Sequence, residues 1–293
     1  MATTITPGFT GYAKADTNYL RFNSCSVNAL QEVEAPDMVM GDYTHNAWAY
    51  GKIEVGGQIS GPLTESTMAF INYVWAGNRN IDIKYYGGFR RRFTGMWVNS
   101  ITINITAGEV VQFTADFIGK GWSTTAAGTM SVYTNPEKLV TWDKCSLFRG
   151  AQSSSDFSAA THEIQHLQSF SMTISNNITR QFAIKASDLY GNLVRGMSAV
   201  TGSLVNYELK SAEGFLGGST QTGEGAEHWN AYENDAYYPI KFSVGGYDVR
   251  ATVVFHRASS ELSVGPVMTT IGFTGIGHWG GENLFTPTHG VIA

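Results

Sequence analysis

The sequence predicts a mainly β fold, built as a sandwich or barrel with one short flanking helix. Alternation of apolar and polar residues with a period of two dominates the chain, which is typical of half-buried strands. Only 15% of the 293 residues are charged, 13% are aromatic and 33 are glycine. This composition favours short strands and tight turns, and it disfavours coiled coils and disordered chains.

The clearest hairpin lies at 100–117. In SITINIT (100–106) the isoleucines occupy alternate positions, and apolar residues alternate again from Val111 to Phe117. Ala107-Gly108-Glu109 separates the two runs. We expect one buried face and one polar face on this hairpin.

Two further segments follow the same pattern. Apolar residues alternate with serine and threonine over 170–174, up to a predicted turn at Asn176-Asn177. A return strand is expected at 178–184, and another strand at 249–255.

Helix is scarce in this chain. The best candidate is 63–75, because Gly61-Pro62 precedes it and Gly77 follows it. A second short helix is predicted near 209–216.

The two halves of the chain resemble each other. Three stretches of the first half have counterparts in the same order in the second: LRFNS (20–24) with LQSFS (167–171), KIEVGGQISGPLTE (52–65) with SAVTGSLVNYELK (198–210), and DFIGKG (116–121) with GFTGIG (272–277). We therefore expect a duplicated sandwich unit, with one domain at 1–150 and a second at 151–293. The polar stretch 150–161 is the expected linker.

The motif HEIQH at 162–166 matches the zinc-protease pattern H-E-x-x-H. That chemistry needs both histidines on one helix and a third ligand. Here the motif runs into the strand at 170–174 and no third ligand follows, so we reject a zinc hydrolase. GIGHWG at 275–280 matches G-x-G-x-x-G but lacks the βαβ context of a dinucleotide site. We expect no enzyme, with no catalytic, metal or cofactor site.

The charge balance disfavours a protein that binds nucleic acid tightly. There are 24 acidic and 19 basic residues, a net charge of −5. Arg90, Arg91 and Arg92 form the one basic cluster, which is either a contact for single strands or, as we favour, a strand edge or subunit contact. The acidic, glycine-rich stretch 208–236 is either a soluble surface or an intersubunit arm.

The N-terminus lacks the pattern of a signal peptide, and no apolar run is long enough to span a membrane. We expect no membrane anchor. Cys25 and Cys145 are expected to be reduced thiols.

Five stretches together resemble the tail tube proteins of tailed bacteriophages. They are GQISGPLTES (57–66), VNSITINITAGEVVQFTADFIGKG (98–121), LQSFSMTISNNITRQFAIK (167–185), VTGSLVNYELK (200–210) and VGPVMTTIGFTGIG (264–277). The resemblance implies a β-sandwich unit with one flanking helix. It also implies rings of such units that stack into a hollow tube, through which the genome passes. Six sandwiches surround the channel in most of the family, so three chains form a ring if both halves are units, and six if they are not.

The resemblance also implies a place in the virion and a set of partners. These are other copies of the chain, the tape measure protein, the tail terminator, distal tail or baseplate proteins, and a sheath if the tail is contractile. Double-stranded DNA passes without specific binding. We expect Glu109 and Asp116 to face the channel, and Arg90–Arg92 to lie at an outer or ring-to-ring surface. The alternative is another β-sandwich virion protein or a glycan-binding module, in which Trp229 and Trp279 stack on sugars.

Overall fold

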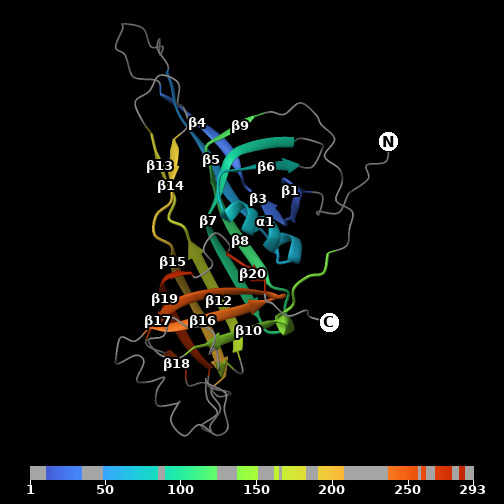
Figure 1. Cartoon of the computed structure of the whole chain (residues 1–293), viewed down its shortest axis with the longest axis vertical. Helices are drawn as coiled ribbons and strands as arrows, with labels where there is room; N and C mark the ends of the chain where they lie inside the picture. Colours follow the sequence, from blue (N-terminus) through green and yellow to red (C-terminus); the bar gives the residue numbers. More distant parts are fainter. Residues whose placement is uncertain are drawn as a thin grey trace.

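The structure is a computed structural model that describes residues 11–34, 49–84, 90–123, 137–150, 162–164, 167–182, 191–207, 237–256, 259–261, 268–278 and 284–287. These residues contain twenty strands, one α-helix and one 3-10 helix. Eighteen of the strands are linked into one large sheet, and every strand pair is antiparallel (Figure 1). The predicted mainly β class with one short helix is confirmed.

The N-terminal set of strands runs from β1 to β9. The bounds are β1 (Tyr12–Ala15), β2 (Asn18–Arg21), β3 (Ser24–Cys25), β4 (Asn28–Glu34), β5 (Ala49–Pro62), β6 (Arg79–Lys84), β7 (Arg90–Thr106), β8 (Gln112–Gly119) and β9 (Gly121–Ser123). Seven of these strands pair in the order β2–β1–β6–β7–β8–β5–β4. In addition, β9 pairs with the start of β7, and β3 pairs with β5 beside β4.

The C-terminal set begins with β10. The bounds are β10 (Cys145–Arg149), β11 (His162–Glu163), β12 (Leu167–Ser175), β13 (Thr179–Gln181), β14 (Asn192–Val194), β15 (Ala199–Tyr207), β16 (Tyr238–Val244), β17 (Tyr247–Phe255), β18 (Ser259–Glu261), β19 (Met268–His278) and β20 (Thr286–Pro287). Seven of these strands pair in the order β11–β10–β16–β17–β19–β15–β12. β20 pairs with the start of β17, and β18 pairs with β19 beside β17.

The two sets therefore pair their strands in the same order. In each set the fourth strand of that order, β7 or β17, also pairs at its start with a short strand that comes later in the chain, β9 or β20. They meet where β12 pairs with β7 over seven residue pairs, from Ser169–Thr106 to Ser175–Ser100. β10 lies before the predicted boundary at 150/151 but pairs with β16. The duplication and the boundary stay predictions.

The predicted helix is observed as α1 (Glu65–Trp75). It starts at this point because the Thr64 side chain accepts a hydrogen bond from the backbone N–H of Thr67 at 3.1 Å, which caps the first turn. Its buried face includes Phe70 and Ile71, and the helix packs mainly against β2, with further contacts to β7 and β1. The second predicted helix, at 209–216, lies outside the described residues.

The predicted hairpin at 100–117 is confirmed as β7–β8. Ile101 lies opposite Ala115 and Ile103 opposite Phe113, and all four are buried. Gly108 adopts φ +87° in the turn, a conformation that glycine accepts without a steric penalty.

The predicted return strand at 178–184 is wrong in its partner. β12 pairs with β7 and β15, whereas β13 pairs with β14. The reason lies at the turn, where the side-chain amide of Asn176 donates to the carbonyl of Val98 at 2.8 Å and Asn177 adopts φ +48°. These contacts carry the chain past β7 instead of folding it back on β12. Residues 183 and 184 lie outside the described residues.

The core of the C-terminal set is aromatic. Phe170 packs against Phe242 and Phe273, with ring centroids 5.0 and 5.9 Å away. The predicted alternation at 249–255 is confirmed, because Val249, Ala251, Val253 and Phe255 are all buried. Near the C-terminus, the amide of Asn72 on α1 exchanges two hydrogen bonds with the backbone of buried Phe285, which ties the two sets together.

Candidate functional site

The face of the large sheet that points away from the core consists of rows of small polar side chains. We call it the hydroxyl face and define it by three rows on β8, β7, β12, β15 and β19, in which residues on adjacent strands lie directly opposite one another. The middle row is Thr114, Thr102, Thr173, Thr201 and Thr274. The flanking rows are Gln112, Asn104, Ser171, Ser203, Gly272 and Asp116, Ser100, Ser175, Ala199.

The strand pleat places these side chains outside. Successive residues of a strand point to opposite faces, and the intervening positions, such as Ile103 and Met172, are buried. Within two of the rows, hydrogen bonds join β7 to β12: the hydroxyls of Thr102 and Thr173 lie 2.8 Å apart, and the Ser171 hydroxyl donates to Asn104 Oδ1 at 2.7 Å. Asp116 is the only charged residue in the three rows.

The structure places Asp116, one of the two predicted channel acids, on the hydroxyl face. Its Oδ2 accepts a hydrogen bond from Asn99 Nδ2 at 3.1 Å. Nearby Arg180 hydrogen-bonds the carbonyl of Val55 and lies 3.9 Å from Glu54 Oε2. Burial lowers the pKa of Arg180, and the charges of Glu54 and Asp116 oppose that shift. The carboxylate therefore has a cation from β13 in its neighbourhood.

Glu109, the second predicted channel acid, lies in the turn between β7 and β8 and is exposed. Its backbone N–H donates to the carbonyl of Thr106 at 3.1 Å, and its carbonyl accepts from Trp142 N–H at 3.2 Å. It is therefore at the end of the hairpin, beyond the three rows.

The arginine cluster is divided between two roles. Arg90 and Arg92 both bind Asp82 on β6: Arg90 Nη2 donates to Oδ2 at 2.6 Å, and Arg92 Nε and Nη2 donate to Oδ1 and Oδ2 at 2.8 Å each. Burial raises the pKa of Asp82, but the hydrogen bonds from Arg92 and Arg90 outweigh it, so the net pKa is lowered. Arg91 points to the other side of the strand, where it donates to Asn28 Oδ1 at 2.8 Å. Two of the three arginines thus serve an ion pair within the chain.

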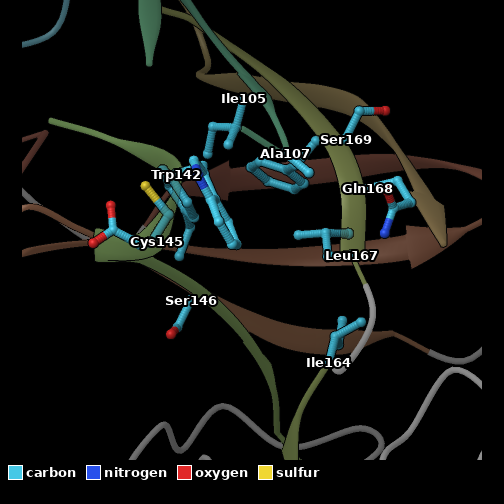
Figure 2. A pocket seen from close by; sticks show the side chains of 12 residues that line it. Ile105, Ala107, Trp142, Cys145, Ser146, Ile164, Leu167, Gln168 and Ser169 are labelled. Carbon is cyan, nitrogen blue, oxygen red and sulfur yellow. The ribbon is translucent and has the colours of Figure 1, made fainter. Parts of the chain in front are cut away.

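A cavity of about 500 Å³ lies where the two strand sets meet. Figure 2 shows Ile105, Trp142 and Cys145 on one side of it and Leu167, Gln168 and Ser169 on the other. Among the described residues that line it, Asp143 and Cys145 are the titratable ones. Burial, with a contribution from the charge of Asp143, raises the pKa of the Cys145 thiol to about 12, so the thiol stays protonated and is a poor nucleophile. Cys145 and Cys25 are not joined in a disulfide.

The two motifs that match enzyme signatures lie on strands. His162 and Glu163 form β11, which pairs with β10, so the start of HEIQH is not on a helix. Gly275–His278 is the end of β19, so the start of GIGHWG is not a phosphate-binding loop. Gln165, His166, Trp229, Trp279 and the whole of 208–236 lie outside the described residues.

In the part of the chain that the structure describes, no three His, Cys, Asp or Glu side chains gather as metal ligands would. It also contains no helix with the length and hydropathy of a membrane span.

A comparison with protein families decides the identity. A family model described as phage tail tube protein matches residues 2–207, which is more than half of the chain. The chain belongs to the phage tail tube protein family. No curated protein matches it in a sequence search. The family match covers the whole N-terminal strand set and continues through β15.

Membership of the family gives this tail tube protein a structural role in the phage tail of the virion, without enzymatic activity, and implies self-assembly. The sequence pattern indicated the polar faces of single strands such as SITINIT. It did not indicate that these faces align into rows, nor that Asp82 pairs with the arginines, because strand partners and register are not visible in a single segment.

Proposed function

We propose that three copies of this tail tube protein close into a ring, that rings stack into a tube, and that the hydroxyl face lines the channel for the genome. The observation that carries this proposal is the makeup of that face. Across five adjacent strands from both sets, its three rows contain one carboxylate and no cation.

Such a face suits a conduit for DNA. Lysine and arginine on the wall would bind phosphates and release counterions, which holds the duplex in place. Hydroxyl and amide groups offer hydrogen bonds that water satisfies equally well, so they contribute little net free energy to DNA binding. Asp116 adds a weak repulsion, which Arg180 reduces.

The count of three chains rests on two sandwich units per chain. The identical order of strand pairing in the two sets supports this duplication. We place the boundary before β10 instead of at 150/151, because β10 pairs with β16. Three chains then supply the six units that surround the channel in most of the family. Native mass spectrometry of single rings tests the count: a ring of six chains would overturn it.

The proposal also assigns positions to Glu109 and Arg91, two charged residues that the sequence analysis selected. Glu109 lies beyond the rows and would be near the rim of a ring. Arg91, which donates to Asn28 Oδ1 on β4, would lie near a subunit contact. The channel would hold the tape measure protein before DNA passes. The tail terminator and distal tail or baseplate proteins would cover the two ends, and a sheath would surround the tube if the tail is contractile.

Cysteine labelling tests which face lines the channel. Thr173→Cys is made in a chain that carries Cys25→Ser and Cys145→Ser, and unassembled protein is compared with tubes verified by electron microscopy. We expect a small maleimide to label both forms. A maleimide on a polyethylene glycol chain too bulky for the channel should label only the unassembled protein.

Two results would overturn the proposal. Equal labelling of intact tubes by the bulky reagent would put the hydroxyl face outside. Purified wild-type protein that forms neither rings nor tubes under any assembly condition would contradict the assembly itself.

A further inference from the structure

We infer that β4 of one copy pairs with β18 of the next, in the register that β12 and β7 adopt within the chain. The inference rests on the proposed ring and specifies its subunit contact. It commits to a second copy of this chain as the partner.

The contact between β7 and β12 inside the chain is the template. Seven residue pairs join these strands, and Asn176 and Ile178 extend the contact beyond β12. The side chain of Asn176 is fully buried there. The contact joins the two strand sets edge to edge, so it is the same kind of junction that a ring of such units requires between chains.

The strands at this junction have counterparts elsewhere in the chain. In the order of pairing, β12 is the last strand of the C-terminal set and β4 is the last strand of the N-terminal set. β7 pairs with β8 in the way that β17 and β18 pair with β19. The central strands align in register: Val55 lies opposite Gly119 on β5–β8, and Val200 lies opposite Gly275 on β15–β19. In both sets a valine thus faces a glycine at the same point of the sheet.

This alignment transfers the register residue by residue. Thr173 lies opposite Thr201, one residue after Val200, and Asn28 lies opposite Gly56, one residue after Val55, so Asn28 corresponds to Thr173. Four residue pairs further along, Thr102 lies opposite Thr114 and Ser259 lies opposite Thr270, so Ser259 corresponds to Thr102. Thr102 and Thr173 are direct partners within the chain. Asn28 of one copy is therefore expected to lie opposite Ser259 of the next.

Both edges are placed for this contact. Among the strands that the structure describes, β4 pairs with β5 alone and β18 with β19 alone. They lie at opposite ends of the strand order, with β4 toward the top and β18 toward the bottom of Figure 1. A contact between two different edges of identical chains runs head to tail, and it forms a ring when the rotation from one copy to the next closes, as the proposed function requires. Leu30 on β4 is 66% exposed, so this edge also presents an apolar side chain that the chain does not bury.

A disulfide between chains tests the register. In the Cys25→Ser and Cys145→Ser background, the pair Asn28→Cys and Ser259→Cys is assembled and oxidised. Direct antiparallel partners have Cα atoms about 4.5–5.5 Å apart, which is within disulfide range. We expect a ladder of linked chains on a non-reducing gel that ends at three, because the ring closes.

Two matched controls fix the interpretation. Asn28→Cys with Ser260→Cys is one residue out of the inferred register, so it should give no ladder. Thr102→Cys with Thr173→Cys should form a bond within one chain and leave it monomeric on the gel.

The outcomes separate this inference from the proposed function. Rings seen by electron microscopy without the Asn28–Ser259 crosslink, or with equal crosslinking of the shifted pair, would overturn the β4–β18 contact and leave the tube intact. A cryo-electron microscopy map of wild-type tubes in which β4 and β18 are far apart would do the same without any substitution. Absence of rings from wild-type protein would overturn the proposed function instead.

Discussion

Replacing Asp82 by asparagine tests whether the arginine cluster stabilises the fold. Asp82 is on β6, and its two carboxylate oxygens accept three hydrogen bonds from Arg90 and Arg92 at 2.6–2.8 Å. Its side chain is 11% exposed, compared with 17% for Arg90 and 37% for Arg92. The substitution keeps the shape of the side chain but removes the negative charge that Arg90 and Arg92 bind.

The expected loss is about 3 kcal/mol of unfolding free energy. Removing one partner of a buried ion pair costs roughly 3–5 kcal/mol, because the remaining charge stays buried. Arg92 is more than a third exposed, so water screens its share, and we take the lower end of the range.

The lowered pKa of Asp82 also predicts how the stability difference between wild type and Asp82→Asn changes with pH. The pKa of Asp82 is lowered in the folded state, so its contribution is fully present above the unfolded pKa, which is about 4 for an aspartate. As the pH falls through the folded pKa, the carboxylate becomes protonated and the contribution is lost. The difference in stability between wild type and Asp82→Asn should therefore be constant near pH 7 and shrink below about pH 4.

Urea unfolding of the unassembled protein, followed by tryptophan fluorescence at several pH values, measures this difference. Asp143→Asn is the matched control, since Asp143 is exposed and its hydrogen bond to Thr141 is local. A midpoint for Asp82→Asn equal to that of wild type at pH 7 would refute a structural role for the cluster. A difference that grows as the pH falls from 5 to 3 would refute the electrostatic account.

Four further predictions concern the core, a close backbone contact, a turn and a thiol. Phe170→Ala should lower the unfolding free energy by about 3–5 kcal/mol in the same urea assay, because the ring is buried between Phe242 and Phe273. Gly202→Ala should cost about 2–3 kcal/mol, since its Cβ would lie 2.3 Å from the carbonyl oxygen of Ser171. Gly108→Ala should cost only about 1 kcal/mol, because nothing lies within 4 Å of its Cβ and only the positive φ opposes it. At pH 8 a chromogenic disulfide reagent should titrate Cys145 in urea but not in native Cys25→Ser protein, since its thiol has a pKa of about 12; fast native labelling would contradict this.

The fold class was predictable because the signal for each strand is local. Alternation at Ile101, Ile103 and Ile105 defines a buried face from one segment alone, and the structure buries all three. The helix was predictable from its flanking residues in the same way. The partner of β12 was not predictable, because alternation sets which face of a strand is buried and leaves the choice of neighbour open.

The candidate site was predictable only in part, for the same reason. Alternation predicts that Asp116 lies on the polar side of its hairpin, and the structure places it there; that it faces the channel stays a prediction. The pairing of Asp82 with Arg90 and Arg92 depends on the register of β6 on β7. One signal for it was present: in RNIDIK a single acid stands between two isoleucines, and an acid held in an otherwise buried strand needs a cationic partner.

The composition of the rows follows from how a closed sheet repeats itself. In the proposed ring, equivalent positions recur on successive strands about 4.8 Å apart. A row of carboxylates at that spacing would place like charges side by side, at a cost of about 3 kcal/mol for each pair at an effective dielectric constant of 20. A hydroxyl both donates and accepts, so a row of threonines continues across any number of strands without such a cost, as Thr102 and Thr173 do. In the proposed ring, hydroxyl rows would therefore leave Asp116 as the one charge of the three rows toward DNA and would allow the sheet to close, which a fully acidic wall would oppose.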